Sequence, residues 1–260
     1  MVCPGVLKGL FLFSLISSGV STQEVDQNTL HKIIQFIDTN YQPPGKNDKG
    51  VHLQYAAAIN VPADQCGPGF SQDNFLSEDS AKTVKEDLEH KHLYMGSQLV
   101  AATPKEPGQT NAVHSERALL MCEYSNDGVT PMQYLQNENK DGCVVFYTYN
   151  SPCLKLCLNE AKDKEAKEAM EKKIQLKRRK IPSLVQKCIL GSLSVLTDHV
   201  GPKAFVFSRV YIEDLESEAL KAALKEVADK VPLYKCDANS CVKCLDNGQI
   251  IEKCLSETET

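Results

Sequence analysis

The apolar residues of the amino-terminal half recur at spacings that predict two helices and two strands. A first helix is expected around Leu30–Ile37, where apolar residues return every three or four positions and stop before the turn-forming segment near Pro43. Strands are expected over Val51–Val61, which ends at a proline, and over Leu93–Thr103. A short helix, Ala81–Glu89, interrupts the polar loop between them. The two strands are therefore expected to pair antiparallel, as a hairpin with a long insertion.

Helices and strands alternate beyond residue 105, an order that predicts parallel pairing. Thr110 or Asn111 can cap a helix that runs through His114 to Cys122, because a short polar side chain there satisfies unpaired backbone donors. Further helices are expected from Pro152 to near Lys180, over Ser183–Leu196 and over Leu215–Lys230. Strands are expected over Cys143–Tyr149, Ala204–Ile212 and Val231–Lys235. Together these elements predict an α/β fold with a mixed sheet covered by helices.

The amino terminus has the pattern of a secretory signal peptide. A single cation, Lys8, precedes an apolar run over Leu10–Ile16, and small residues allow cleavage after Ser21. The alternative is a membrane anchor, but the run is well short of the roughly 20 residues that cross a bilayer. We therefore expect a secreted, soluble protein with a signal peptide (1–21), an N-terminal helix and linker (22–50), a main domain (51–235) and a cysteine-rich C-terminal tail (236–260).

The eleven cysteines agree with an oxidising destination, where disulfides persist. If two of them bind metal and Cys3 leaves with the signal peptide, eight remain, which permits up to four bridges in a pairing that the sequence leaves open. The disulfide candidates are the four cysteines of the tail, Cys236, Cys241, Cys244 and Cys254. The alternative for this cluster is a second zinc site, because Cys241 and Cys244 have CxxC spacing.

The candidate chemistry lies in two motifs, His114-Ser115-Glu116 and Pro152-Cys153 followed by Cys157. One histidine and two cysteines can supply three zinc ligands and leave the fourth tetrahedral position for water, as catalytic sites do. An ion bound in this way lowers the pKa of that water toward about 7. Glu116 lies at the start of the same helix as His114, close enough to transfer a proton without binding metal. The alternative makes His114 a surface residue and pairs Cys153 or Cys157 in disulfides.

These motifs resemble the HxE and PCxxC motifs of the zinc-dependent cytidine deaminase superfamily, and within it those of the AID/APOBEC-like branch. The resemblance covers about Val51–Lys235, and the signal peptide points to the secreted AID/APOBEC-like deaminases. It implies a cytidine-deaminase-like three-layer α/β/α sandwich with a mixed five-stranded sheet. It also implies a Zn²⁺ cofactor held by His114, Cys153 and Cys157, with Glu116 as the catalytic residue.

The resemblance extends to segments that contact substrate in the family. Tyr149-Asn150-Ser151-Pro152-Cys153 is similar to an aromatic-Ser-Pro-Cys segment, and Ser208-Arg209-Val210-Tyr211 is similar to the strand end that leads to a nucleic-acid-contacting loop. Tyr211 can stack on a target base or pack in the core, and Asn111 can bind the nucleotide or cap the helix. The expected substrate contacts are Tyr211, Asn111, Tyr149, Asn150 and Arg209.

Two departures from the family pattern affect this site. Three residues separate Cys153 from Cys157 where many relatives have two, which changes how Cys157 is presented. Asn150 stands where polynucleotide-acting members carry tryptophan, so the wall of the base pocket differs.

The charge distribution leaves the substrate class open. Residues 162–187 contain ten basic and four acidic residues, a net charge of +6 in a chain whose net charge is −5. This basic tract can attract a polyanion, or it can be a solvated helix whose cations favour the negative end of the helix dipole.

The resemblance implies hydrolytic deamination of cytosine to uracil in single-stranded DNA or RNA, with innate defence as a role by analogy. One alternative is a deaminase of free cytidine or deoxycytidine, which the acidic pI near 5.7 favours. The other is a non-catalytic secreted binding protein stabilised by zinc and disulfides, which the intact Glu116 disfavours.

Overall fold

The computed structural model describes residues 24–47, 50–107, 112–122, 128–166, 168 and 187–257. The predicted signal peptide, Asn111 and most of the basic tract lie outside these ranges. Within them, no helix is both long enough and apolar enough to cross a membrane.

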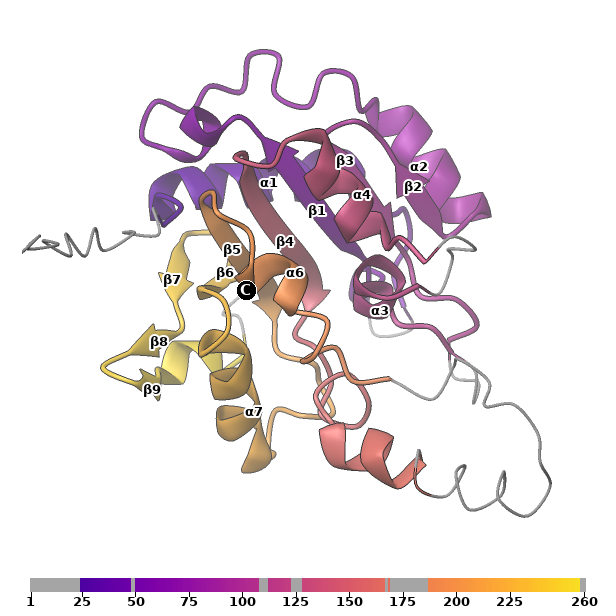
Figure 1. Cartoon of the computed structure of the whole chain (residues 1–260), viewed down its shortest axis with the longest axis vertical. Helices are drawn as coiled ribbons and strands as arrows, with labels where there is room; N and C mark the ends of the chain where they lie inside the picture. Colours follow the sequence, from indigo (N-terminus) through magenta and orange to yellow (C-terminus); the bar gives the residue numbers. More distant parts are fainter. Residues whose placement is uncertain are drawn as a thin grey trace, which may run out of the picture.

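A mixed sheet of seven strands, in the order β2-β3-β1-β4-β5-β6-β7, forms the centre of the molecule (Figure 1). The strands are β1 (Ala56–Val61), β2 (Leu93–Met95), β3 (Leu99–Ala102), β4 (Cys143–Asn150), β5 (Lys203–Arg209), β6 (Leu233–Cys236) and β7 (Cys241–Lys243). β1 pairs antiparallel with β3 and β4, whereas β4 with β5 and β5 with β6 are parallel. The predicted mixed pairing is therefore confirmed.

Each face of the sheet carries its own hydrophobic core. Val144 and Phe146 of β4 point into one core, while Val145 and Tyr147 point into the other. Because both faces are covered, the central strands are continuous apolar runs, which is the pattern of strands buried on both sides. This explains why strands β4 and β5 could be predicted from the sequence.

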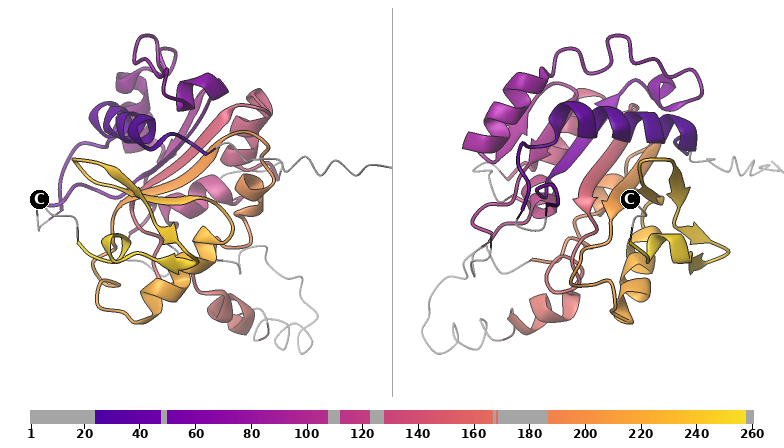
Figure 2. Two further views of the ribbon diagram at one scale, coloured as in Figure 1. Left: turned by 90° about the vertical axis from the view of Figure 1, so that its left-hand side faces the viewer. Right: turned by 180° about the vertical axis from the view of Figure 1, so that it is seen from behind.

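Helices α1 (Gln27–Tyr41) and α2 (Ala81–His90) contribute to the core on one face. Helices α3 (Ser115–Leu120), α4 (Pro131–Glu138), α6 (Ser194–Thr197) and α7 (Ala219–Ala228) contribute to the other. The front view shows α3, α4 and α6 before the sheet, and the view from behind shows α1 across its opposite face (Figures 1 and 2). Leu30, Ile33 and Ile37 of α1 are fully buried, so the predicted first helix is confirmed.

The expected five-stranded sheet is wrong because two further strands join it. The segment expected as one strand over Leu93–Thr103 is a hairpin of β2 and β3 that turns at Gly96. A side-chain carbon at Gly96 would collide with the carboxylate of Asp79, so only glycine fits this turn. The second additional strand is β7, which pairs antiparallel with β6 and comes from the tail.

Three predicted helices differ from the structure. Residues 154–158 form turns and the helical residues begin at 160, so no helix starts at Pro152. Within Ser183–Leu196, the described part is mostly turns that end in the single turn of α6, because its apolar residues pack into the core from an irregular segment. Helix α3 begins at Ser115, with His114 as the residue before it, whereas Thr110 and Asn111 lie outside the described residues.

The tail joins the sheet through β7 and contains two internal disulfides. Cys236 is joined to Cys241 and Cys244 to Cys254, so the four candidate cysteines form two disulfides and do not form a second zinc site. A small hairpin of β8 (Leu245–Asp246) and β9 (Gln249–Ile250) and a 3₁₀ helix, η2 (Glu252–Cys254), follow. A third disulfide joins Cys66, at the end of the 3₁₀ helix η1 (Ala63–Cys66), to Cys143 at the start of β4.

Candidate metal centre and adjoining pocket

Three side chains that can bind a metal lie together where α3 begins and β4 ends. His114 is the residue immediately before α3, and Cys153 and Cys157 lie in the segment that follows β4. Their ligand atoms all lie within 4.8 Å of one another, with His114 Nδ1 3.2 Å from Cys157 Sγ and 3.7 Å from Cys153 Sγ. Both cysteines are buried and neither forms a disulfide, so the alternative with bridged cysteines is wrong.

This cluster fits a tetrahedral zinc ion. Bonds of about 2.3 Å to sulfur and about 2.0 Å to nitrogen would place ligand atoms about 3.5 to 3.8 Å apart, close to the observed separations. The pKa of Cys153 is lowered to about 4, first by the hydrogen bond from the Cys157 thiol and also by that from His114, and the thiolate is the form that binds metal. The donor set of one histidine and two cysteines leaves one tetrahedral position open.

Backbone hydrogen bonds hold the two cysteines in place without a helix. The Leu158 amide donates to the Cys153 carbonyl at 3.0 Å, and the Ile189 amide donates to the Cys157 carbonyl at 2.8 Å. The second bond ties the ligand turn to a segment some 30 residues further along the chain. The ligand geometry therefore depends on the core that buries Ile189.

Glu116 lies in the first turn of α3 with only 3% of its surface exposed. Burial raises the pKa of its carboxyl above the ordinary value, and the nearby His114 opposes that rise. Its Oε1 accepts hydrogen bonds from Gln54 at 3.1 Å and Thr148 at 3.0 Å, and its Oε2 accepts one from Ser115 at 3.2 Å. A buried, hydrogen-bonded carboxyl with a raised pKa beside a metal-binding cluster is suited to carry protons.

Gln54, which precedes β1, connects this carboxyl to the strand end. Its Nε2 lies within hydrogen-bond distance of Glu116, Thr148 and Ser115. Its Oε1 accepts from both the backbone amide and the side-chain amide of Asn150, at 2.8 and 2.9 Å. One side chain therefore orients both the carboxyl and the residue that faces it across the pocket.

A pocket of about 200 Å³ opens beside the cluster. Its lining consists of His114, Glu116, Cys153, Gln54, Asn150, Ser151 and Tyr211, together with the apolar residues Pro104, Pro107 and Ala112. Ser151 Oγ accepts a hydrogen bond from the Tyr211 backbone amide at 3.0 Å, and the Leu154 amide donates to Asp214 at 2.9 Å. These bonds fix the segment after β5 against the segment after β4.

The structure divides the expected substrate contacts between two places. Asn150 and Tyr211 line the pocket beside the metal ligands. Tyr149 and Arg209 do not reach it and line a separate cavity on the α1 side of the sheet. Asn111 lies outside the described residues.

Gln54, Ser115 and Thr148 are the polar residues of the site that sequence reasoning missed. Thr148 could have been found, because it lies on the same face of its strand as Val144 and Phe146 and is a polar residue in a buried position. Gln54 belongs to no motif. Its role depends on the pairing of β1 with β4, which sets Tyr55 opposite Tyr149.

Comparison with known proteins gives one finding. A family model described as Secreted Novel AID/APOBEC-like Deaminase 1 matches residues 27–189 and 185–258, a span that contains all three metal-binding side chains and Glu116. No curated protein and no solved structure shows a match.

Proposed function

Because the chain belongs to the Secreted Novel AID/APOBEC-like Deaminase 1 family, we propose that it is an extracellular, zinc-dependent cytosine deaminase that acts on single-stranded DNA or RNA. The observation that carries this proposal is the buried carboxyl of Glu116 beside the cluster of His114, Cys153 and Cys157, with Glu116, His114 and Cys153 lining one pocket. Helices on both sides of a mixed sheet support the cytidine-deaminase-like α/β/α arrangement that the family implies.

His114, Cys153 and Cys157 would hold the zinc ion. When bound, the ion supplies an activated water for attack on C4 of the base. The reaction consumes one water and converts cytosine to uracil and ammonia.

Glu116 moves the protons in this scheme. Its carboxylate accepts a proton from the attacking water and returns it to the base, so that the amino group leaves as ammonia. The raised pKa of Glu116 favours this role, because a carboxyl whose pKa lies closer to the operating pH both takes up and releases protons readily. Gln54 and Thr148 keep the carboxylate oriented between the two steps.

The size of the pocket supports a single base as the reacting group. Its volume of about 200 Å³ lies below the roughly 300 to 1,000 Å³ of pockets that enclose drug-sized ligands. Tyr211 and Asn150 form walls against which a base can stack and hydrogen-bond. In place of the tryptophan of relatives, Asn150 offers an amide that Gln54 already orients.

Secretion and the three disulfides support a site of action outside the cell. An extracellular deaminase meets foreign or released nucleic acid, and innate defence is the role that we infer by analogy. The net charge of −5 favours the free-nucleoside alternative, since a negative chain repels a polyanion.

The test is a deamination assay on the zinc-loaded protein with cytidine, single-stranded DNA and single-stranded RNA of matched cytosine content. Uracil formation is measured by mass spectrometry, with Glu116→Ala as the inactive control. Turnover of an oligonucleotide that exceeds turnover of cytidine supports the proposal. Turnover of cytidine alone would transfer the assignment to a nucleoside deaminase, and no turnover of any substrate with zinc bound would favour the binding protein.

A further inference from the structure

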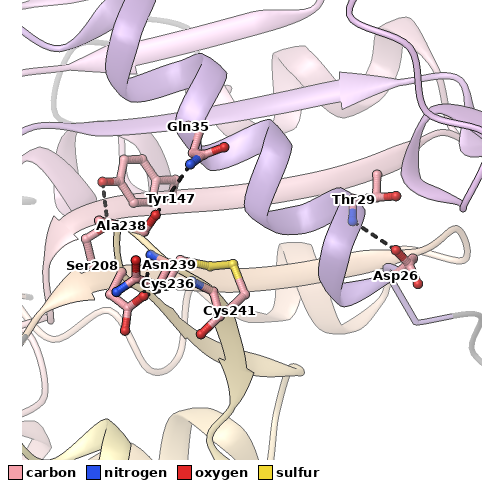
Figure 3. The surroundings of a disulfide bond; sticks show 11 residues. Asp26, Thr29, Gln35, Tyr147, Ser208, Cys236, Ala238, Asn239 and Cys241 are labelled. Carbon is pink, nitrogen blue, oxygen red and sulfur yellow. Dashed lines mark hydrogen bonds between the residues drawn. A yellow bond between two sulfur atoms is a disulfide. The ribbon is translucent and has the colours of Figure 1, made fainter.

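A second and larger cavity lies against the same edge of the sheet, on the side covered by α1. It has a volume of about 950 Å³ and runs between the second half of α1 and the turn that joins β6 to β7. We call it the α1 groove and define it by Gln35, Asp38, His52, Tyr149, Arg209 and Asn239. Figure 3 shows the turn beside it, with Ala238 and Asn239 next to the Cys236–Cys241 disulfide and Gln35 of α1 reaching toward Ala238.

The α1 groove and the metal-site pocket are lined by neighbouring residues of the same strand ends. Three neighbouring pairs each contribute one residue to the groove and one to the pocket: Tyr149 and Asn150, Arg209 and Tyr211, and His52 and Gln54. Asn150 and Arg209 are themselves partners in the parallel pairing of β4 with β5. Tyr149 and Asn150 are consecutive, with Cα atoms about 3.8 Å apart, so one residue at the end of β4 lines the groove and the next lines the pocket.

A chain of hydroxyl groups ends at a carboxyl in the groove. Tyr55 and Tyr147 both donate to Asp38 Oδ1, at 2.6 and 2.8 Å, and Tyr147 is also within 2.8 Å of Ser208 Oγ (Figure 3). Among the described residues, Oδ2 of Asp38 has no hydrogen-bond partner, although Asp38 lines the groove. The network therefore fixes the carboxyl and leaves one oxygen to recognise a ligand.

The groove also carries a cation and a pair of aromatic rings. Within the described part of the chain, Arg209 forms no ion pair, whereas the other acid of the groove, Asp237, accepts from the backbone amides of Asn239 and Ser240. His52 and Tyr149 stand edge to face, with ring centroids 6.3 Å apart. An unpaired guanidinium, an aromatic pair and amide side chains together match a phosphate, a ring and the polar edge of a base.

We propose that the α1 groove binds a nucleotide next to the target cytosine on the same strand, with the phosphate on Arg209, the base on Tyr149 and the polar edge of the base at Asp38. This proposal rests on the proposed function and adds to it a second contact site. A strand whose cytosine enters the metal-site pocket crosses the edge formed by Asn150 and reaches the groove within the next nucleotides. Free cytidine occupies only the pocket.

The first experiment compares substrates of increasing length. The quantity is kcat/KM for a nine-nucleotide DNA or RNA with one central cytosine, divided by kcat/KM for cytidine. Arg209→Ala and Tyr149→Ala should each lower this ratio about tenfold, because base stacking and phosphate contacts act only on the polymer. Lys82→Ala removes one exposed cation from α2 and should leave the ratio within twofold of the unchanged protein.

A second experiment needs no variant in the groove. The zinc-loaded Glu116→Ala protein is bound to oligonucleotides that carry a photoreactive pyrimidine one or two positions from the cytosine, and crosslinked peptides are identified by mass spectrometry. Crosslinks on His52, Tyr149 or Arg209 themselves, located by fragmentation of the crosslinked peptides, support the groove, and crosslinks confined to other residues overturn it. If the oligonucleotide is deaminated with an unchanged ratio in both groove variants, the groove proposal fails and the deaminase stands. If cytidine is the only substrate, the polymer assignment itself fails.

Discussion

The Glu116 carboxylate is buried, yet each of its oxygens receives a hydrogen bond and neither takes part in the metal-binding cluster. This separation makes it possible to remove proton transfer and metal binding independently. His114, Cys153 and Cys157 supply the ligand atoms, whereas Glu116 and Gln54 supply none.

Replacing Glu116 with glutamine should abolish most of the activity while leaving zinc in place. The amide has nearly the same shape but accepts no proton, and positioned acid-base groups contribute about 10²- to 10⁴-fold to rates. We expect kcat to fall by that factor and the zinc content to stay near one per chain by elemental analysis. His114→Ala and Cys153→Ala should instead lose zinc and stability together. Wild-type turnover in Glu116→Gln would contradict the role given to this residue.

Two substitutions of Gln54 test whether this residue positions the Glu116 carboxyl or only supports the fold. Gln54→Ala removes the hydrogen bonds to Glu116 and Asn150, and we expect kcat to fall about tenfold, as for loss of a hydrogen bond to a charged group. Gln54→Glu keeps the shape but sets a second carboxylate beside Glu116, and a like charge raises the pKa of Glu116 further. Since the base acts when ionised, the acid limb of the kcat–pH profile should move to higher pH. A profile that does not move, with normal folding by circular dichroism, would show that Gln54 does not act on Glu116.

Motifs predicted the cluster and Glu116, because fixed spacings of histidine and cysteine carry information within a short stretch of sequence. The residues that orient Glu116 were not predictable in this way. Gln54 lies 62 positions from Glu116 and 94 from Thr148 in the sequence, and it meets both only after β1 pairs with β4. Side-chain direction was equally unpredictable. The resemblance placed Tyr149 and Arg209 with Tyr211 as substrate contacts, but in the structure they line the α1 groove and Tyr211 lines the metal-site pocket.

Among the elements, the strands of the centre were predicted more accurately than the segments that hold the ligands. β4 and β5 are largely apolar runs between turn residues, and both strands are buried on both faces, so their apolar sequence matches their environment. The segment after Pro152 and the segment before α6 have apolar residues at helical spacing but form turns, because Cys153 and Cys157 must converge on His114. Tertiary constraint therefore overrode local spacing next to the site.

The disulfides should contribute unequally to stability because they close loops of different length. The Cys66–Cys143 bridge spans 77 positions and the Cys236–Cys241 bridge spans five. The chain-entropy relation gives about 4.5 kcal/mol for the first and about 2 kcal/mol for the second. Urea unfolding of the double variants Cys66→Ala/Cys143→Ala and Cys236→Ala/Cys241→Ala is the measurement. Equal losses, or a larger loss for the short loop, would contradict the ranking.

At the scale of the whole molecule, the net charge opposes the polymeric substrate that we propose. The net charge is −5, but residues 162–187 carry +6, so the negative charge is concentrated elsewhere. We therefore expect the tract to attract a polyanion that the rest of the chain repels.

Salt dependence measures how far this tract assists binding. Each phosphate contact should contribute about 0.7 to the slope of log affinity against log salt for a single strand. Changing Lys177, Arg178, Arg179 and Lys180 together to glutamine should flatten the slope while turnover of cytidine is retained. The matched control changes four exposed lysines outside the tract, Lys82, Lys91, Lys221 and Lys225. A slope that flattens equally in both variants would mean that only net charge matters.

Helix α1 packs against β7, and Lys243 of that strand pairs with Glu24 just before the helix. The helix is made first and its partner strand emerges about 200 residues later, which at 5 to 20 residues per second is a delay of about 10 to 40 s. During this interval the part of α1 that packs against β7 has no lasting partner. A nascent chain that stops before Cys236 lacks both that strand and the last two disulfides, and it should be retained and degraded by quality control in the secretory pathway.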